Sequence, residues 1–197
     1  MDLTRDRIPL LIRRIAVPAS IGFVFSTLYN VVDTYYAGLL STEALASLSL
    51  SFPVFFLLIA IGSGIGTGAT ALISNHLGAG KEEKARIYTA QAISFGVLTG
   101  IILTFIGTAA APTMFTILGA RGEYLDMSLE YMNTILLGAV FFMTVYVLNA
   151  GLRARGDTRT FRNVLVAGFL LNIVLDPLFM FGGFGFPALG LAGVAWA

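Results

Sequence analysis

The sequence predicts an all-α integral membrane protein, a helical bundle of about six transmembrane helices. Hydrophobic residues make up 57% of the chain, charged residues make up 12%, and the mean hydropathy is +0.86. Soluble domains carry about 25% charged residues, so this chain has too few to cover a surface that faces water. Its apolar runs are long enough to cross a bilayer as helices, and they lack the period-two alternation of barrel strands.

Hydropathy divides the chain into five complete spans and the start of a sixth. About twenty apolar residues cross the hydrocarbon core as a helix, and each of the first five runs is about that long or longer. The predicted spans are 15–39, 45–77, 87–111, 125–152 and 164–182, with a sixth beginning near Ala188. The sixth run stops at Ala197, so we expect 1–197 to be a fragment truncated within its sixth helix.

The distribution of lysine and arginine predicts the direction of the spans. Cytoplasmic segments of membrane proteins carry an excess of these residues. With a cytoplasmic N-terminus, eleven of the twelve cations fall inside, and Arg121 alone falls outside. The inner cations are Arg5, Arg7, Arg13, Arg14, Lys81, Lys84, Arg86, Arg153, Arg155, Arg159 and Arg162. Topology is a sufficient explanation for these charges, and we expect no nucleic-acid partner.

Two acidic residues lie well inside predicted spans, Asp33 in the first and Asp176 in the fifth. An aspartate at the centre of a membrane helix costs about 2.5–3.5 kcal/mol on insertion scales, so a functional role is the default hypothesis. The alternative is a structural carboxylate that neighbouring hydroxyl groups satisfy.

The two carboxylates are predicted to lie at a similar depth, because both spans run from inside to outside and each Asp precedes the outer end by about six residues. Tyr29 and Asn30 share a helical face with Asp33, and Asn172 shares one with Asp176. Such a cluster offers hard oxygen ligands for a small cation such as sodium. It suits a proton equally well, and the local sequence does not choose between them.

The glycines of Gly62-Ser-Gly64-Ile-Gly66-Thr-Gly68 lie in the middle of the second span. No strand precedes them, so a dinucleotide-binding loop is excluded and no cofactor is expected. Gly62 pairs with Gly66, and Gly64 with Gly68, at the spacing that lets membrane helices pack closely. We interpret the run as a packing motif.

Pro18 lies in the inner part of the first span. A proline inside a helix removes one hydrogen bond and kinks the helix. Two interpretations stay open: a static bend, or a hinge that responds to the charge state of Asp33.

Several segments resemble the multidrug and toxic compound extrusion (MATE) transporters, in order and with fitting spacing. They are NVVDTYYAGLLSTEALASLSLSFPV, GSGIGTGATALISNHLGAGKEEKAR, LRARGDTR and LLNIVLDPLFMFG. The last of these is the most specific, and it resembles the DinF-like prokaryotic branch.

The resemblance implies twelve helices in two lobes, of which this chain is the N-terminal lobe and its own C-terminal lobe is missing. It implies a multi-pass protein of the prokaryotic plasma membrane that is not an enzyme. That protein would export organic, often cationic, compounds by antiport with sodium or protons. The coupling site, including any bound sodium, then maps to Asp33, Asn172 and Asp176, and the hinge to Pro18. Cavity-lining positions are Tyr29, Asn30 and Asn149.

Three alternatives remain at this stage. A lipid-linked precursor flippase of the same superfamily would be expected to carry more cations within its spans. An intramembrane aspartyl protease would need a Gly-x-Gly-Asp context, which neither Asp33 nor Asp176 has. A non-transporting membrane protein is the third alternative.

Overall fold

The computed structural model describes residues 7–183 and 185–197, which form seven helices. They are α1 (Ile8–Leu40), α2 (Thr42–Gly78), α3 (Glu82–Ile117), α4 (Glu123–Leu137), α5 (Ala139–Ala154), α6 (Arg159–Phe181) and α7 (Ala192–Trp196). Four of them, α1, α2, α3 and α6, are each long and apolar enough to cross a membrane, and the bent pair α4–α5 makes a fifth crossing if it is one span. The all-α membrane fold is therefore confirmed. Arg5, which the charge count includes, lies outside the described residues.

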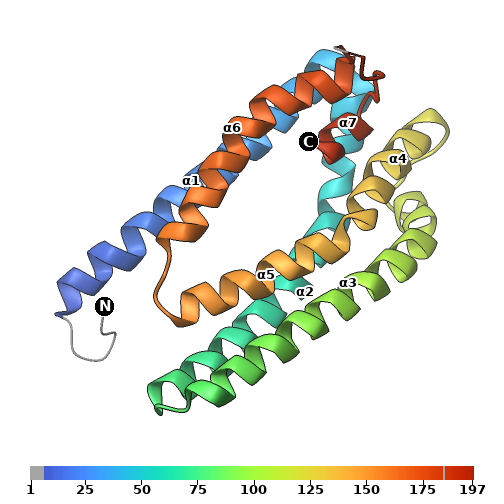
Figure 1. Ribbon diagram of the computed structural model, residues 1–197. Helices are drawn as coiled ribbons and strands as arrows, with labels where there is room; N and C mark the ends of the chain where they lie inside the picture. The colour runs from blue at the N-terminus through green and yellow to red at the C-terminus, as the bar shows by residue number, and fades with distance from the viewer. Residues whose placement is uncertain (1–6, 184) are drawn as a thin grey trace.

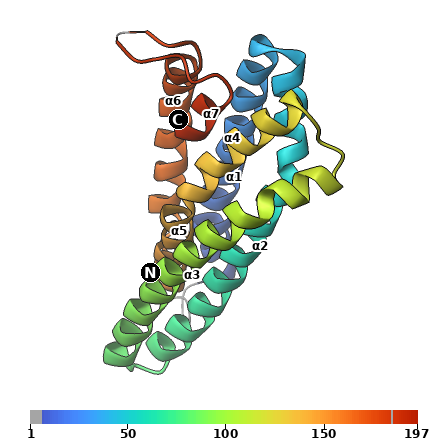
Figure 2. The ribbon, with the colours of Figure 1, turned by 90° about the vertical axis from the view of Figure 1, so that its right-hand side faces the viewer.

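The helices form two groups, α1 with α6, and α2 with α3, α4 and α5. The groups meet where α1 contacts α2 and where α7 lies against both α4 and α6. Figure 1 shows α6 running alongside α1, and α3 running alongside α2 and α5. Figure 2 shows α7 beside α4 and α6 at the end opposite the α2–α3 loop. The start of α1 and the α2–α3 loop, which both carry basic residues, lie at the same end.

Short polar or glycine-containing connections separate the long helices. Ser41 alone divides α1 from α2, and its hydroxyl accepts a hydrogen bond from the backbone N–H of Ala44 at 3.0 Å, as an N-cap serine does. Gly80 follows α2 with φ of +71°, a conformation that glycine adopts at little cost. The short connection at Gly80 lets α2 and α3 pack as antiparallel neighbours, whereas α1 and α2 diverge from their turn at Ser41.

The helices extend beyond the predicted spans into polar sequence. The first three contain 33, 37 and 36 residues. α3, for example, begins at Glu82 rather than near Ile87, because acidic residues in a first turn stabilise a helix N-terminus. Large apolar side chains remain exposed along the helices, among them Phe105, Ile117 and Phe141 at 72–80%. Such surfaces suit contact with lipid.

The predicted fourth span, 125–152, is not a single straight helix. It divides at Gly138 into α4 and α5, which are inclined by 49°. Across the break, α3 approaches the backbone of α5 so closely that a Cβ on Gly100 would lie 2.5 Å from Val140 Cα. The hydroxyl of Thr104, also on α3, donates a hydrogen bond to the Leu136 carbonyl at 2.7 Å. The bend is therefore supported by packing and by a polar contact from the neighbouring helix.

Replacing Thr104 by valine should lower the free energy of unfolding by about 1 kcal/mol, because the Leu136 carbonyl loses its side-chain donor at the bend. Thermal unfolding of the purified protein in detergent measures the effect. Thr134→Val is the matched control, since the Thr134 hydroxyl bonds only the Glu130 carbonyl of its own helix. Equal stabilities of the two variants would show that the Thr104 contact does not support the bend.

The glycine motif of α2 is a packing surface on one of its two faces. A Cβ on Gly62 would meet the ring of Tyr146 at 2.6 Å, and one on Gly66 would meet the Tyr146 carbonyl oxygen at 3.2 Å. The packing prediction is therefore confirmed for Gly62 and Gly66, which let α5 pack closely against α2. No atom lies within 4 Å of a Cβ built on Gly64 or Gly68, so this second pair makes no close helix contact here.

Candidate cation-binding site

Helices α1 and α6 approach each other at a glycine, and this approach positions the candidate site. Gly22 is buried, and a Cβ at that position would lie 3.1 Å from Leu165 Cδ1 and 3.5 Å from Arg162 Cα. A small residue at a crossing lets membrane helices come close together. Two to three turns further along each helix, the polar residues of the two helices therefore face each other.

The structure brings together Asp33 of α1 with Asn172 and Asp176 of α6. The Asn172 side-chain amide donates one hydrogen bond to Asp33 Oδ1 at 3.0 Å and another to Asp176 Oδ1 at 2.9 Å. Asn172 and Asp176 are 0% exposed, and Asp33 is 8% exposed. Both N–H groups of one amide are thus used to hold two carboxylates from different helices.

Two oxygen atoms of this cluster are buried without a hydrogen-bond partner, Asn172 Oδ1 and Asp176 Oδ2. Burial of an unpaired polar atom costs about 1–3 kcal/mol, and more for a charged group. Two ionised carboxylates this close also repel each other. A sodium ion or a proton bound between them would remove the repulsion and satisfy the unpaired oxygens, which are hard ligands of the kind that small cations bind.

Two tyrosines lie near the carboxylates. They are Tyr29 of α1 and Tyr131 of α4. Tyr131 is buried at 8% exposure. Sequence reasoning missed Tyr131, because nothing in a continuous apolar span shows which residues of α4 face α1.

The other predicted site residues take different positions. Asn30 is exposed, and its amide donates to the Ser26 carbonyl of its own helix at 2.8 Å, so it does not join the cluster. Asn149 lies on α5, where its Oδ1 is buried without a partner. Pro18 is buried inside α1, which continues through it.

The backbone carbonyl that Pro18 leaves without its helical partner has a new one. In a regular helix the N–H of residue 18 would donate to the carbonyl of residue 14, and proline has no N–H. The hydroxyl of Thr158, in the α5–α6 loop, instead donates to the Arg14 carbonyl at 3.4 Å. Thr158 is 7% exposed, so this contact joins α1 to the start of α6 in a buried position.

The same arrangement occurs at the other end of the helix pair. Pro177 follows Asp176 in α6 and leaves the Ile173 carbonyl without its helical donor. The Tyr36 hydroxyl of α1 donates to that carbonyl at 3.4 Å. One of these cross-helix contacts therefore lies within the Asp33–Asn172–Asp176 cluster and the other near the inner end of the helix pair, and each uses a carbonyl freed by a proline.

Comparison with known proteins assigns the family. The MatE family model matches residues 18–178. An FAD transporter of Shewanella oneidensis is 31% identical over 182 residues, covering 92% of this chain and 40% of that protein. A probable multidrug resistance protein, NorM, of Thermotoga maritima is 33% identical over 186 residues, covering 93% of this chain and 40% of that protein.

Solved structures agree with the sequence comparison. An outward-facing multidrug resistance MATE family transporter of the MOP superfamily superposes with a TM-score of 0.87 at 33% identity, covering 94% of this chain and 40% of that one. The chain thus spans about two fifths of the length of these relatives. Since the family model covers most of its residues and a solved member shares its helix arrangement, the chain belongs to the MatE family.

Proposed function

We propose that this chain forms the N-terminal lobe of a secondary active transporter, which exports small organic compounds across a prokaryotic plasma membrane by antiport with sodium or protons. The observation that carries the proposal is the buried cluster of Asp33, Asn172 and Asp176 with its two unpaired oxygens. A C-terminal lobe is the expected partner, and it would supply the second wall of the translocation path.

In this proposal, electrostatic repulsion within the cluster links ion binding to the arrangement of helices α1 and α6. When it is empty, two carboxylates from α1 and α6 repel each other in a buried setting. A bound sodium ion or proton draws the two helices together through Asp33 and Asp176, while Asn172 keeps both oriented. Since the ion favours one arrangement of the helices over the other, its binding shifts the population between them, as antiport requires.

The names of the relatives limit the substrate to a class. One is named an FAD transporter and others are named multidrug resistance or export proteins, all of them transport proteins rather than enzymes. We propose a small organic substrate.

Isothermal titration of the purified protein with sodium across a pH series tests the ion site. We expect saturable sodium binding in the unmodified protein, and a loss of at least about tenfold in affinity in Asp176→Asn, because one carboxylate of the pair is gone. Glu43→Gln removes an exposed carboxylate from the first turn of α2 and should bind normally.

The other outcomes are equally informative. The proton would be identified as the coupling ion if sodium addition produces no heat of binding while the protein releases protons in a pH-dependent way. That proton release should be lost in Asp176→Asn. Neither signal in a protein that unfolds cooperatively would refute the site.

A further inference from the structure

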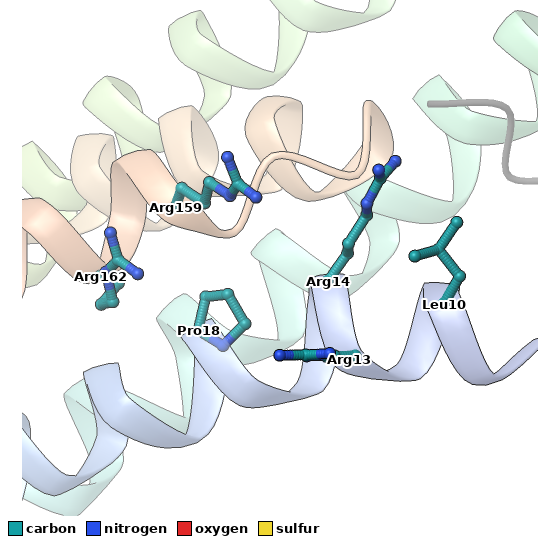
Figure 3. Close-up of a pocket in the computed structure, with 6 residues that line it drawn as sticks. All are labelled: Leu10, Arg13, Arg14, Pro18, Arg159 and Arg162. Atoms are coloured by element: carbon teal, nitrogen blue, oxygen red, sulfur yellow. The ribbon is translucent and has the colours of Figure 1, made fainter.

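A second polar site lies at the inner end of the same helix pair. A cavity of about 530 Å³ opens between α1 and α6, and Figure 3 shows four arginines around it, Arg13 and Arg14 from α1 and Arg159 and Arg162 from α6. Leu10 and Pro18 complete its lining. The cavity lies just before both predicted spans, where the bilayer surface is expected.

The cavity concentrates positive charge. Among the residues that the structure describes, no carboxylate lines it. Arginine stays protonated at any accessible pH, so four guanidinium groups here repel one another until an anion binds. The Arg162 guanidinium is directed by its two hydrogen bonds to Asn163 Oδ1, at 3.1 and 2.7 Å.

Among the described residues, Asp157 brings a carboxylate close to two of these arginines. Asp157 lines an adjoining cavity of about 430 Å³ that shares Arg14 and Arg159. Its oxygens accept hydrogen bonds from the Thr160 hydroxyl at 2.7 Å and from the backbone N–H groups of Arg159 and Thr160, both at 3.1 Å. These bonds hold the pKa of Asp157 below its ordinary value, so this carboxylate stays ionised at the start of α6.

Contacts between α1 and α6 hold the arginines that line the cavity close together. The Thr158 hydroxyl holds the Arg14 carbonyl of α1, one residue before Arg159 of α6. Gly22 closes the gap between the helices one turn beyond Pro18. The arginines of the two helices are therefore presented around one space rather than spread along a flexible tail.

We propose that this cavity binds the phosphate group of an anionic phospholipid of the inner leaflet. Guanidinium groups bind phosphate oxygens in bidentate pairs, so one arginine from each helix can bind the two free oxygens of a phosphodiester, and the other two add attraction for the anion. A lipid is favoured over a soluble phosphate because exposed apolar residues lie on the membrane side of the arginines, Val17 of α1 at 51% and Val164 of α6 at 59%. They would contact the acyl chains of the bound lipid. The proposal does not depend on the exported substrate or on the coupling ion.

The test is calorimetric titration of the purified protein in neutral detergent with short-chain phosphatidylglycerol, phosphatidylcholine and inorganic phosphate. We expect saturable phosphatidylglycerol binding with one site per protein, much weaker phosphatidylcholine binding, and weak phosphate binding at the same site. The double variant Arg13→Gln with Arg159→Gln should lose at least about tenfold in affinity for phosphatidylglycerol, since it removes one guanidinium from each helix.

Arg86→Gln is the matched control, because Arg86 is an exposed inner arginine on α3 that lines neither cavity. Equal weakening in the control and in the double variant would mean general charge attraction and would overturn the site. Phosphate that binds as tightly as phosphatidylglycerol would overturn the lipid assignment. If the double variant does not fold, the single variants Arg13→Gln and Arg159→Gln decide, and unchanged affinity in both contradicts the proposal.

Discussion

Exchanging Asp33 for asparagine should abolish ion-driven export by a full-length transporter of which we propose this chain is the N-terminal lobe. Asparagine can still accept the hydrogen bond from the Asn172 amide, so the contact at 3.0 Å between α1 and α6 is preserved. What is lost is one negative charge of the pair that attracts the cation. We expect transport to fall about a hundredfold or more, to the level of cells without the protein, because in the proposed mechanism this ion couples substrate binding to the conformational change.

Uptake of a fluorescent organic cation by energised cells, with protein abundance measured in the same cells, checks this result. Glu43→Gln makes the same change of carboxylate to amide at an exposed position in the first turn of α2, and it should transport normally. Drug tolerance that survives in Asp33→Asn at normal abundance would show that the cluster is structural and not a coupling site.

The second large effect is expected from Gly100→Ala, on stability. A Cβ at position 100 would lie 2.5 Å from Val140 Cα and 2.9 Å from Val140 N, both backbone atoms that cannot rotate away. Helix α3 would have to move from α5, at a cost of about 1–3 kcal/mol or more from overpacking. The better helix propensity of alanine, about 1 kcal/mol, offsets only part of this loss.

Thermal unfolding in detergent separates this steric effect from propensity. Gly64→Ala makes the same substitution within a long membrane helix where no atom lies within 4 Å of the new Cβ, so its midpoint should be unchanged or higher. A lower midpoint in Gly100→Ala beside an unchanged one in Gly64→Ala is the expected pair of results. Identical midpoints would show that α3 and α5 do not pack as closely as Gly100 indicates.

The sequence was informative where a residue type is unusual for its surroundings. Asp33 and Asp176 are costly within apolar runs, and helical spacing alone places Asn172 on the same face as Asp176. Their similar depth could be predicted because the charged loops indicate the direction of each span, and the resemblance to MATE transporters implied that they belong to one site. Whether Asn30 joins this group could not be predicted from the sequence, because its side-chain amide can also donate to a backbone carbonyl of its own helix, as it does to Ser26.

The sequence was uninformative where the outcome depends on a neighbouring helix. Gly138 is one of 22 glycines, and an apolar run gives no sign that the chain bends there. The bend is supported by Gly100 and Thr104, which lie on α3. The arginine cavity was missed for a different reason: topology already explained its charges, so nothing in the sequence indicated that four of them surround one space.

The two proline-freed carbonyls have a mechanical consequence. Thr158 holds the Arg14 carbonyl near one end of the helix pair, and Tyr36 holds the Ile173 carbonyl near the other. A change of bend at Pro18 cannot stay local under this arrangement, because it either breaks the Thr158 bond or pulls the loop after α5 along with α1. With the Thr158 bond intact, a bend of α1 at Pro18 would therefore move the start of α6 with it.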